Sequence, residues 1–448
     1  MKQLLILLLF SSFLTTGFTT EIKEQVNKLP NVIIIYADDM GWGDVGYHGV
    51  DNILTPNIDK LAQSGIYFTQ GYVSSSICSP SRCGLLTGVY QQRFSSGQNN
   101  RDNDPHIALF RKQSQISEIL KPAGYYSGII GKWHLGEDET LRPNKRGWDE
   151  FYGFLGGSHS FFKATKKYTK NLDFRPIYRN NEIVDYEGYA TEVFTAEAID
   201  FLKRNHPEKT GNPFCLYVAY NAVHFPWEVP DKYIQRVSFI KNQNRRLFAG
   251  MVLAMDDGIG QIINALDEEG LSDNTIVIFI SDNGSPRGQL GDMSSTGPFR
   301  GWKGDCLEGG TRIPYIIKWP GQIEAGSKYD KPVINLDIVP TIASFIGLKN
   351  MEKYNFDGEN ILPYIKGEID SEKTPHENLF WKRGNDWAIR NGDWKLVVEY
   401  QKDNRDPMLF NLSNDIGERN DLAGEFPEKA KELKIIYDKW MNSLPNLK

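Results

Sequence analysis

The chain has 448 residues, of which 40% are hydrophobic and 24% are charged. This composition is typical of a globular protein and excludes a disordered chain; the 41 Gly and 22 Pro follow no fixed period, which excludes collagen. Lys and Arg number 51 against 57 Asp and Glu, a net charge of −6, and no basic block stands out. We therefore expect no nucleic-acid partner, and any anionic substrate must be held by local cationic groups.

The first twenty residues differ from the rest of the chain. Lys2 gives a short positive start, Leu4–Phe10 is an unbroken apolar run, and Ser11–Thr20 is mostly small and polar. The apolar run is shorter than the ~20 residues that cross a membrane, but it fits the centre of a secretory signal peptide. We predict that residues 1–20 direct export to the periplasm or the extracellular space, without a stable membrane anchor. The alternative is a buried N-terminal helix.

Strand patterns then alternate with helical patterns. Asn31–Ala37 is a continuous apolar run, which is typical of a strand buried on both faces of a parallel sheet. Similar runs predict strands at Tyr126–Ile130, Phe214–Tyr220, Thr275–Ser281 and Ile313–Trp319. The helical patterns between them are Thr55–Ser64, Ile116–Leu120, Thr191–Arg204 and Arg246–Glu269. This alternation predicts an α/β fold with a mostly parallel sheet flanked by helices, interrupted by a loop-rich stretch at Gly136–Tyr189.

The C-terminal part has a different pattern. Short strand-like segments are separated by turn signals, and they lie at Asn378–Trp381, Trp387–Arg390, Trp394–Tyr400 and Met408–Asn411. Asn391-Gly392 is a strong hairpin signal, and Pro427–Ser443 has a helical pattern. We predict a small antiparallel sheet with one helix over residues 361–448, after a larger α/β domain over residues 21–360.

Acidic and amide side chains follow two of the predicted strands. Asp38 and Asp39 come after the first, and Asp282-Asn283-Gly284 comes after Thr275–Ser281. Ligands of open α/β sheets gather at the carboxyl ends of strands, and these are hard oxygen ligands suited to Ca²⁺ or Mg²⁺ rather than to zinc or copper. Adjacent carboxylates also require the backbone to turn. Taken alone, Asp38-Asp39 could instead be a solvated turn that caps a helix.

The segment from Ser76 to Gly88 carries a candidate nucleophile. Pro80 suits the first turn of a helix, which places Cys78 just before the helix N-terminus and Arg82 about one turn further on. The helix terminus and the guanidinium both create positive potential, which predicts an anion site and a low pKa for Cys78. Cys83 is expected in the core.

The remaining cysteines give weaker signals. Four cysteines in so long a chain do not form a disulfide scaffold, and there is no C-x-x-C pair, which excludes a zinc ribbon or a thioredoxin-type site. Cys215 is expected in a core strand, and a bridge between Cys215 and Cys306 stays open.

Cys78-x-Pro80-x-Arg82 followed by Leu85-Leu86-Thr87-Gly88 resembles the formylglycine motif of the type I sulfatases. A second family signature is similar to Gly124–His134. The resemblance extends over nearly the whole mature chain, through Asp38-Asp39, His224, Asp282-Asn283-Gly284, Lys303 and the closing segments Ala388–Val397 and Leu409–Asp421.

The resemblance implies an alkaline-phosphatase-like α/β fold and sulfate-ester hydrolysis. It implies that a separate maturation enzyme oxidises Cys78 to Cα-formylglycine. It further implies one Ca²⁺, with Mg²⁺ as the second choice, held by Asp38, Asp39, Asp282 and Asn283, with residue 78 facing the metal.

The family chemistry assigns roles to six residues of this chain. The hydrated aldehyde of residue 78 would attack sulfur, while the sulfate oxygens are held by the metal and by Arg82, Lys132, His224 and Lys303. The departing sugar oxygen needs a proton, for which His224 is the first choice and Lys303 the second. His134 would take the proton of the second hydroxyl, which expels sulfate. The division of the proton transfers stays open.

The expected substrate is a sulfated sugar in a polysaccharide or oligosaccharide. His159 and Arg300 are the candidate substrate-binding residues, and neither the sugar nor the sulfated position can be predicted. One alternative is a phosphodiesterase or phosphonate hydrolase of the same superfamily, although cationic side chains occupy the positions where a second metal would need carboxylates. Another is a catalytically silent protein that binds sulfated glycans.

Overall fold

The structure is a computed structural model that describes residues 29–94, 97, 99, 107–164, 175–287, 293–399 and 406–445. The predicted signal peptide, residues 1–20, lies outside the described residues. Of the helices within these ranges, none combines the length and the apolar character that a membrane crossing requires.

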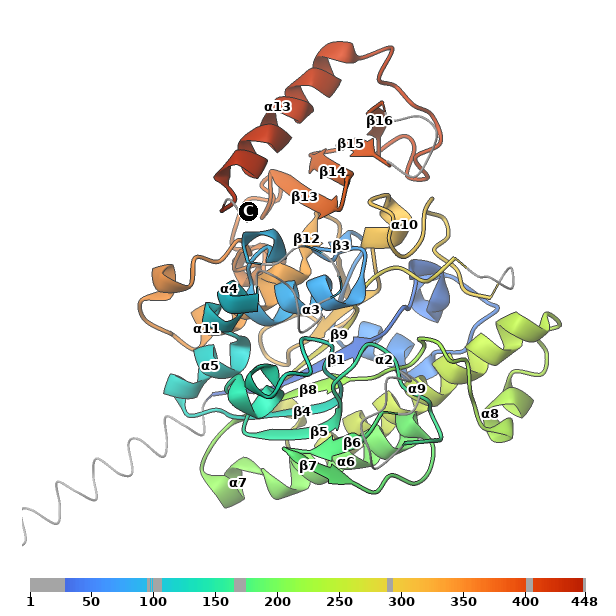
Figure 1. Ribbon diagram of the computed structural model, residues 1–448, viewed down its shortest axis with the longest axis vertical. Coiled ribbons are helices and arrows are strands. Elements are labelled where there is room, and N and C mark those ends of the chain that lie inside the picture. The colour runs from blue at the N-terminus through green and yellow to red at the C-terminus, as the bar shows by residue number, and fades with distance from the viewer. Residues whose placement is uncertain are drawn as a thin grey trace, which may run out of the picture.

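A ten-stranded sheet forms the centre of the larger part of the molecule (Figure 1). Its strands run in the order β11 (Ser327–Tyr329), β2 (Ile66–Phe68), β10 (Tyr315–Lys318), β9 (Thr275–Ser281), β1 (Asn31–Ala37), β8 (Phe214–Ala219), β4 (Tyr126–Lys132), β5 (Glu150–Phe154), β6 (Ile177–Arg179) and β7 (Glu182–Val184). The five central strands, β9 to β5 in this order, are parallel. The outer strands β10, β6 and β7 pair antiparallel with their neighbours. The mostly parallel sheet that the sequence predicts is therefore confirmed.

Helices cover both faces of the sheet (Figure 1). One face carries α3 (Cys78–Thr87), α5 (Ile116–Leu120) and α11 (Ile338–Phe345), and the other carries α2 (Pro56–Ser64), α6 (Ala190–Arg204) and α9 (Gln243–Glu268). The shorter elements are α4 (Ile107–Lys112), α7 (Pro207–Thr210), α8 (Asp231–Arg236), α10 (Glu308–Thr311), α12 (Leu362–Ile365), β3 (Gly71–Tyr72) and β12 (Val333–Ile334).

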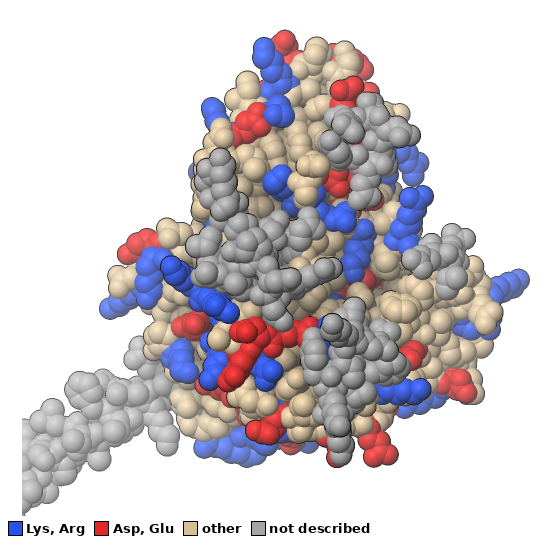
Figure 2. Space-filling model, in the orientation of Figure 1, with Lys and Arg blue, Asp and Glu red and all other residues tan. Residues whose placement is uncertain are grey.

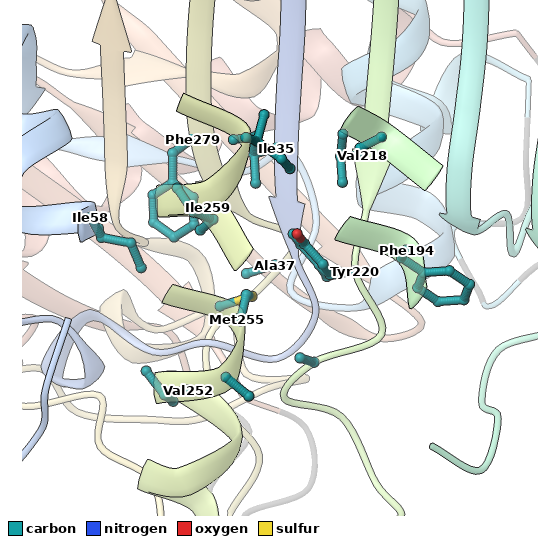
Figure 3. Packing of buried hydrophobic residues seen from close by; sticks show 14 of the residues in the cluster. Ile35, Ala37, Ile58, Phe194, Val218, Tyr220, Val252, Met255, Ile259 and Phe279 are labelled. Atoms are coloured by element: carbon teal, nitrogen blue, oxygen red, sulfur yellow. The ribbon is translucent and has the colours of Figure 1, made fainter. Parts of the chain in front are cut away.

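Strand β1 supplies both cores because successive side chains point to opposite faces. Ile33, Ile35 and Ala37 belong to the cluster on the α9 side, whereas Val32, Ile34 and Tyr36 belong to the cluster under α3. Figure 3 shows Ile35 and Ala37 near Val252, Met255 and Ile259 of α9. Each fully buried aliphatic side chain stabilises the fold by about 1.5–3 kcal/mol, so β1 is held firmly from both sides.

A second, smaller sheet follows in the C-terminal part. It contains β13 (Asn378–Arg383), β14 (Asp386–Asn391), β15 (Trp394–Val398) and β16 (Met408–Asn411), all antiparallel, and α13 (Pro427–Ser443) packs against it. The hairpin predicted at Asn391-Gly392 is confirmed, because Asn391 pairs with Trp394. We call β13–β16 the C-terminal sheet. Its core also includes Tyr72, Tyr90 and Cys306 from the larger part.

The strand register brings the predicted site residues to one edge of the large sheet. Ala37 of β1 pairs with Ser281 of β9, so Asp38 and Asp282 follow side by side. Lys132 ends β4, which pairs with β8 one residue earlier, at Gly131 and Ala219. Figure 2 shows Lys and Arg mixed with Asp and Glu over the face in view, so a cationic site here is a local feature.

Candidate active site

Cys78 opens helix α3 and lies beside the acidic strand ends. It is the first residue of the helix, after Ile77 as N-cap, and Pro80 occupies the first turn as expected. Its Sγ lies 3.8 Å from Oδ1 of Asp39. Arg82, one turn further on, is completely buried and donates to Oδ2 of Asp282 at 2.9 Å. One short helix thus presents both the candidate nucleophile and a buried cation.

The two acidic strand ends form one cluster. The backbone N–H of Asp39 donates to Oδ1 of Asp282 at 3.0 Å, and Nδ2 of Asn283 donates to Oδ1 of Asp39 at 2.7 Å. Asp39 has a φ of 64°, in the left-handed region. This conformation is rare and unfavourable for a residue with a side chain, and such residues cluster at functional sites. The turn that two adjacent carboxylates require is therefore present.

Cationic side chains surround the carboxylates. Nζ of Lys132 lies 2.6 Å from Oδ2 of Asp38, and Nζ of Lys303 lies 2.6 Å from Oδ1 of Asp39. The Arg82 and Lys132 side chains are 0% exposed, whereas Lys303 and His224 are each 19% exposed. His224 points Nε2 toward Oδ2 of Asp39 at 3.6 Å. A molecule arriving from solvent would therefore meet Lys303 and His224 first.

The Cys78 thiol is not acidified. Burial raises its pKa to about 12, and Lys132 and Lys303, which act in the opposite direction, do not offset burial. Asp282 and Asp38 raise the pKa further. The low pKa predicted from the helix terminus and Arg82 is therefore wrong, because the sequence pattern does not show how deeply the thiol is buried. An unmodified Cys78 is a protonated thiol at neutral pH.

Both histidines of the site are neutral at neutral pH. Burial, followed by Lys132 and Arg82, lowers the pKa of His134 well below its usual value. Burial, followed by Lys303, lowers the pKa of His224 to about 3. Nδ1 of His224 lies 2.6 Å from the carbonyl oxygen of Phe225, so that nitrogen carries the proton of the neutral ring and Nε2 is an acceptor. His134 has a left-handed φ of 58°, and its ring packs where a Cβ on Gly157 would stand.

The donor set suits a hard divalent cation. Ligand atoms of Asp38, Asp39, Cys78 and His224 all lie within 4.8 Å of one another. Oδ1 of Asp38 and Oδ1 of Asn283 are buried and accept no hydrogen bond from the described residues, although Oδ1 of Asp38 lies 3.5 Å from a guanidinium nitrogen of Arg82. Buried oxygens without partners are what a cation would complete, and carboxylate and amide oxygens are ligands of Ca²⁺. Asp282 also faces the cluster, but one of its oxygens accepts from Arg82.

The side chains of the two predicted substrate-binding residues contact backbone carbonyl oxygens. His159 is buried, with Nδ1 2.5 Å from the carbonyl oxygen of Ser160 and Nε2 2.8 Å from that of Arg175. Arg300 turns toward the C-terminal sheet and donates to the carbonyl oxygen of Glu418 at 2.6 Å. These contacts are consistent with structural roles, and sugar binding by either residue stays a prediction. Cys215 and Cys306 are both free thiols, which answers the question of a bridge.

Sequence analysis missed Tyr217 of β8. Its buried hydroxyl accepts a hydrogen bond from Arg82 at 3.2 Å and so orients the guanidinium. Tyr217 stands two residues from Cys215 and from Ala219, and all three belong to the core on the α3 side. The alternation of side chains along the predicted strand could have placed it on the same face as Arg82.

Comparisons with known proteins agree with this site. The family described as Sulfatase matches residues 30–348, and the family described as N-sulphoglucosamine sulphohydrolase, C-terminal, matches residues 303–443. N-acetylgalactosamine-6-sulfatase of Homo sapiens is 31% identical, over 91% of this chain and 84% of the relative. Arylsulfatase J of Mus musculus is 33% identical, over 90% of this chain and 74% of the relative.

Solved structures give the same picture. Ps i-CgsB, in complex with k-i-k-neocarrahexaose, is 34% identical with a TM-score of 0.84, over 92% of each chain. The phosphonate monoester hydrolase of Agrobacterium radiobacter, at 19% identity and a TM-score of 0.62 over 93% of this chain and 95% of that one, shares the fold alone. The alkaline-phosphatase-like fold is thus confirmed. Because the Sulfatase family matches most of the chain and includes the Cys78 and Lys132 segments, this protein belongs to the sulfatase family and is a sulfuric ester hydrolase.

Proposed function

We propose that this sulfatase hydrolyses sulfate esters on a sugar of a polysaccharide or oligosaccharide, with a formylglycine made from Cys78 and one Ca²⁺. The observation that carries the proposal is the group of cationic side chains near residue 78, at the N-terminus of α3. Arg82, Lys132 and Lys303 each form an ion pair with a carboxylate of the site. The sugar follows from the relatives, which include an N-acetylgalactosamine-6-sulfatase and a protein solved with a neocarrahexaose.

The proposed metal ligands are Asp38, Asp39, Asp282 and Asn283, together with residue 78. A Ca²⁺ there would supply positive charge next to the reacting sulfate group. A soft thiol is a poor ligand for Ca²⁺, whereas the hydroxyl oxygens of a hydrated formylglycine are hard donors. The high pKa of the Cys78 thiol supports the same conclusion, because the unmodified residue is a protonated, weak nucleophile.

We assign the remaining steps to side chains of the chain. A hydrated formylglycine would offer one hydroxyl to attack sulfur and a second whose deprotonation releases sulfate. His134 is the candidate to accept that second proton, because the ring is neutral and its Nδ1 is buried without a hydrogen-bond partner among the described residues. Arg82 and Lys132 are suited to hold the developing negative charge, since both are buried and fixed by ion pairs.

We propose Lys303, rather than His224, as the proton donor to the departing sugar oxygen. His224 is neutral and keeps its proton on Nδ1, which faces the Phe225 carbonyl group. Burial, the largest single effect, lowers the pKa of the Lys303 ammonium group, but Asp39 together with Cys78, Asp38 and Asp282 outweighs it, so Lys303 stays charged. Both side chains reach solvent, so His224 is free to accept a hydrogen bond from the substrate.

The proposal includes export and maturation. Residues 1–20 would direct the chain out of the cytoplasm, and a separate formylglycine-generating enzyme would modify Cys78. Mass spectrometry of the peptide that contains residue 78 detects the aldehyde directly.

Sulfate release from a panel of sulfated mono- and oligosaccharides, with phosphate esters alongside, tests the proposal. The formylglycine-bearing protein should release sulfate, and Cys78→Ala should not. Cys83→Ala is the matched control, since Cys83 is buried on the same helix but lies in the apolar core, and it should stay active. A chelator should abolish release, and Ca²⁺ should restore it. Formylglycine at residue 78 with no release from any sulfated sugar, or faster turnover of phosphate esters, would contradict the proposal.

A further inference from the structure

We propose that the C-terminal sheet and the segments that follow its strands position Lys303, so that Arg383, Lys395, Glu399 and Glu418 are positioning residues for sulfate-ester hydrolysis. The inference rests on the proposed function in one respect, namely that Lys303 acts on the sulfate ester. The segment concerned is residues 300–308, which we call the lysine loop.

The lysine loop joins the two halves of the active site. The backbone N–H of Lys303 donates to the carbonyl oxygen of Ser285 at 2.9 Å, beyond the end of β9. The N–H of Gly304 donates to the carbonyl oxygen of Ser76 at 2.8 Å, two residues before Cys78. Gly301 and Gly304 have φ angles of +90° and +95°, so the loop adopts a backbone that other residues rarely take. These bonds and the ion pair of Lys303 with Asp39 hold the side of the loop that faces the large sheet, and further supports hold its other side.

Those further supports come from the C-terminal sheet. Arg383, at the end of β13, donates from a guanidinium nitrogen to the carbonyl oxygen of Gly304 at 2.8 Å. Glu399, just after β15, accepts from the N–H of Cys306 at 2.8 Å. At the start of the loop, Arg300 donates to the carbonyl oxygen of Glu418. Hydrogen bonds therefore hold the lysine loop both before and after Lys303.

Glu308 anchors the end of the loop by buried charge. One carboxylate oxygen lies 2.8 Å from Nζ of Lys395, and the other accepts from the Tyr72 hydroxyl at 2.6 Å. The N–H of Glu308 donates to Glu418 at 2.7 Å, and Glu418 also pairs with Lys395 at 3.0 Å. The side chains of Glu308, Lys395 and Glu418 are all fully buried.

A purely stabilising role does not explain this arrangement. Buried ion pairs add little net stability compared with apolar packing, but they fix a geometry because a displaced partner leaves a charge unpaired. The two parts of the molecule already share an apolar core, with Tyr72 and Leu307 beside Trp381 and Leu396. Several polar contacts between the two parts, those of Arg383, Glu399, Lys395 and Glu418, converge instead on the backbone and the end of the loop that carries a reacting side chain.

A double-mutant cycle between Arg383 and Lys303 tests the inference. Arg383 is suitable because its side chain is 28% exposed, so Arg383→Ala should fold. We expect Arg383→Ala to lower kcat for sulfate release by roughly 10- to 100-fold, as a displacement of about 1 Å does, with a smaller change in KM. In a Lys303→Ala background the same change should lower kcat by less than about twofold, because the two residues then act as one unit. If the decreases in kcat caused by Arg383→Ala and by Lys303→Ala multiply in the double variant, the inference is overturned.

Glu399 provides a second test with a conservative rescue. Glu399→Gln keeps an oxygen that can accept from Cys306 N–H, so its kcat should stay near that of the unchanged protein, whereas Glu399→Ala should lose activity. Equal losses in both variants would contradict a role through this hydrogen bond.

The same cycle can be measured without turnover. Calorimetric binding of inorganic sulfate to Cys78→Ser protein, with and without Arg383→Ala and Lys303→Ala, should show the same non-additivity, and additive changes in affinity would overturn the inference. This measurement separates the two proposals. An inactive protein that carries formylglycine contradicts the proposed function, whereas additive effects contradict the positioning role alone.

Discussion

Among the cationic and histidine side chains that contact the site carboxylates in the described residues, Lys303 and His224 reach solvent. Lys303 is charged, whereas His224 is neutral. If Lys303 protonates the leaving oxygen, its loss should matter most when that oxygen belongs to a poor leaving group. We expect Lys303→Ala to lower kcat/KM on a sugar sulfate by roughly 10²–10⁴-fold, and to lower it far less on a nitrophenyl sulfate, whose leaving group needs no proton. The measurement is kcat/KM on both esters.

His224→Ala is the comparison for this experiment. Because His224 keeps its proton on the side of the Phe225 carbonyl group, it should affect both esters to a similar extent. A loss with Lys303→Ala that is equal on both esters would rule out a role in proton donation. A selective loss on the sugar ester with His224→Ala would return that role to His224.

At the scale of residues, the sequence predicted what short motifs specify. The segments around Asp38, Cys78, Lys132 and Asp282 lie together as expected, because each follows or faces a strand end on one sheet edge. The pKa of Cys78 could not be predicted, since burial dominates it. His159 and Arg300 meet carbonyl groups of Arg175 and Glu418, which lie 16 and 118 residues away in the sequence.

Strand β4 shows how one element fixes two site residues. Gly131 precedes Lys132, has a φ of +107°, and an added Cβ would stand 2.0 Å from the carbonyl oxygen of Ala219 in β8. Gly131→Ala therefore strains the backbone and forces β4 away from β8. We expect a loss of roughly 3 kcal/mol in the free energy of unfolding, with loss of turnover because Lys132 and His134 move. Denaturant unfolding and sulfate release measure the two effects.

Gly211→Ala is the matched control for Gly131→Ala. Gly211 has a φ of +72°, but an added Cβ there would meet nothing within 4 Å. This variant should lose only about 1 kcal/mol and keep its turnover. If the two variants lose the same stability, the contact between β4 and β8 is not what requires glycine at 131.

Among the elements, long apolar runs were predicted best. The bounds of β1, β9, α5 and α13 agree with the sequence, whereas β5, β6 and β7 fall in a stretch whose weak periodicity predicted only loop. The run at Ile313–Trp319 does form a strand, β10, but it is antiparallel to β9. Strand direction depends on distant partners, and an apolar run favours a parallel strand without fixing its direction.

At the scale of the whole molecule, the division into residues 21–360 and 361–448 remains a proposal about architecture, and the contacts argue that the two parts fold together. Trp381 of β13 is buried, donates from its indole nitrogen to the carbonyl oxygen of Val73 at 2.7 Å, and packs on Tyr72 with the ring centroids 5.4 Å apart. Figure 1 shows β13 facing β3 and β12 across this contact. The C-terminal sheet thus shares its core with segments that lie near Cys78.

We therefore expect Trp381→Ala to destabilise both parts together. Truncating a buried Trp costs about 3–5 kcal/mol, and the chain should still unfold in one transition at a lower Tm. Labelling of Cys215, in the central sheet, and of Cys306, at the shared core, reports on each part during heating. Coincident exposure of the two thiols is the signature of one cooperative unit.

Trp387→Ala is the control variant for Trp381→Ala. Trp387 stacks on Tyr437 of α13, with the centroids 4.2 Å apart, and is half-buried on the side of the C-terminal sheet that faces α13. Its loss should lower the Tm less, because only the packing of α13 is weakened. Two separate transitions in Trp381→Ala, with Cys306 exposed well before Cys215, would show instead that the C-terminal sheet unfolds on its own. Lys303 would then depend on a support that can detach while the large sheet stays folded.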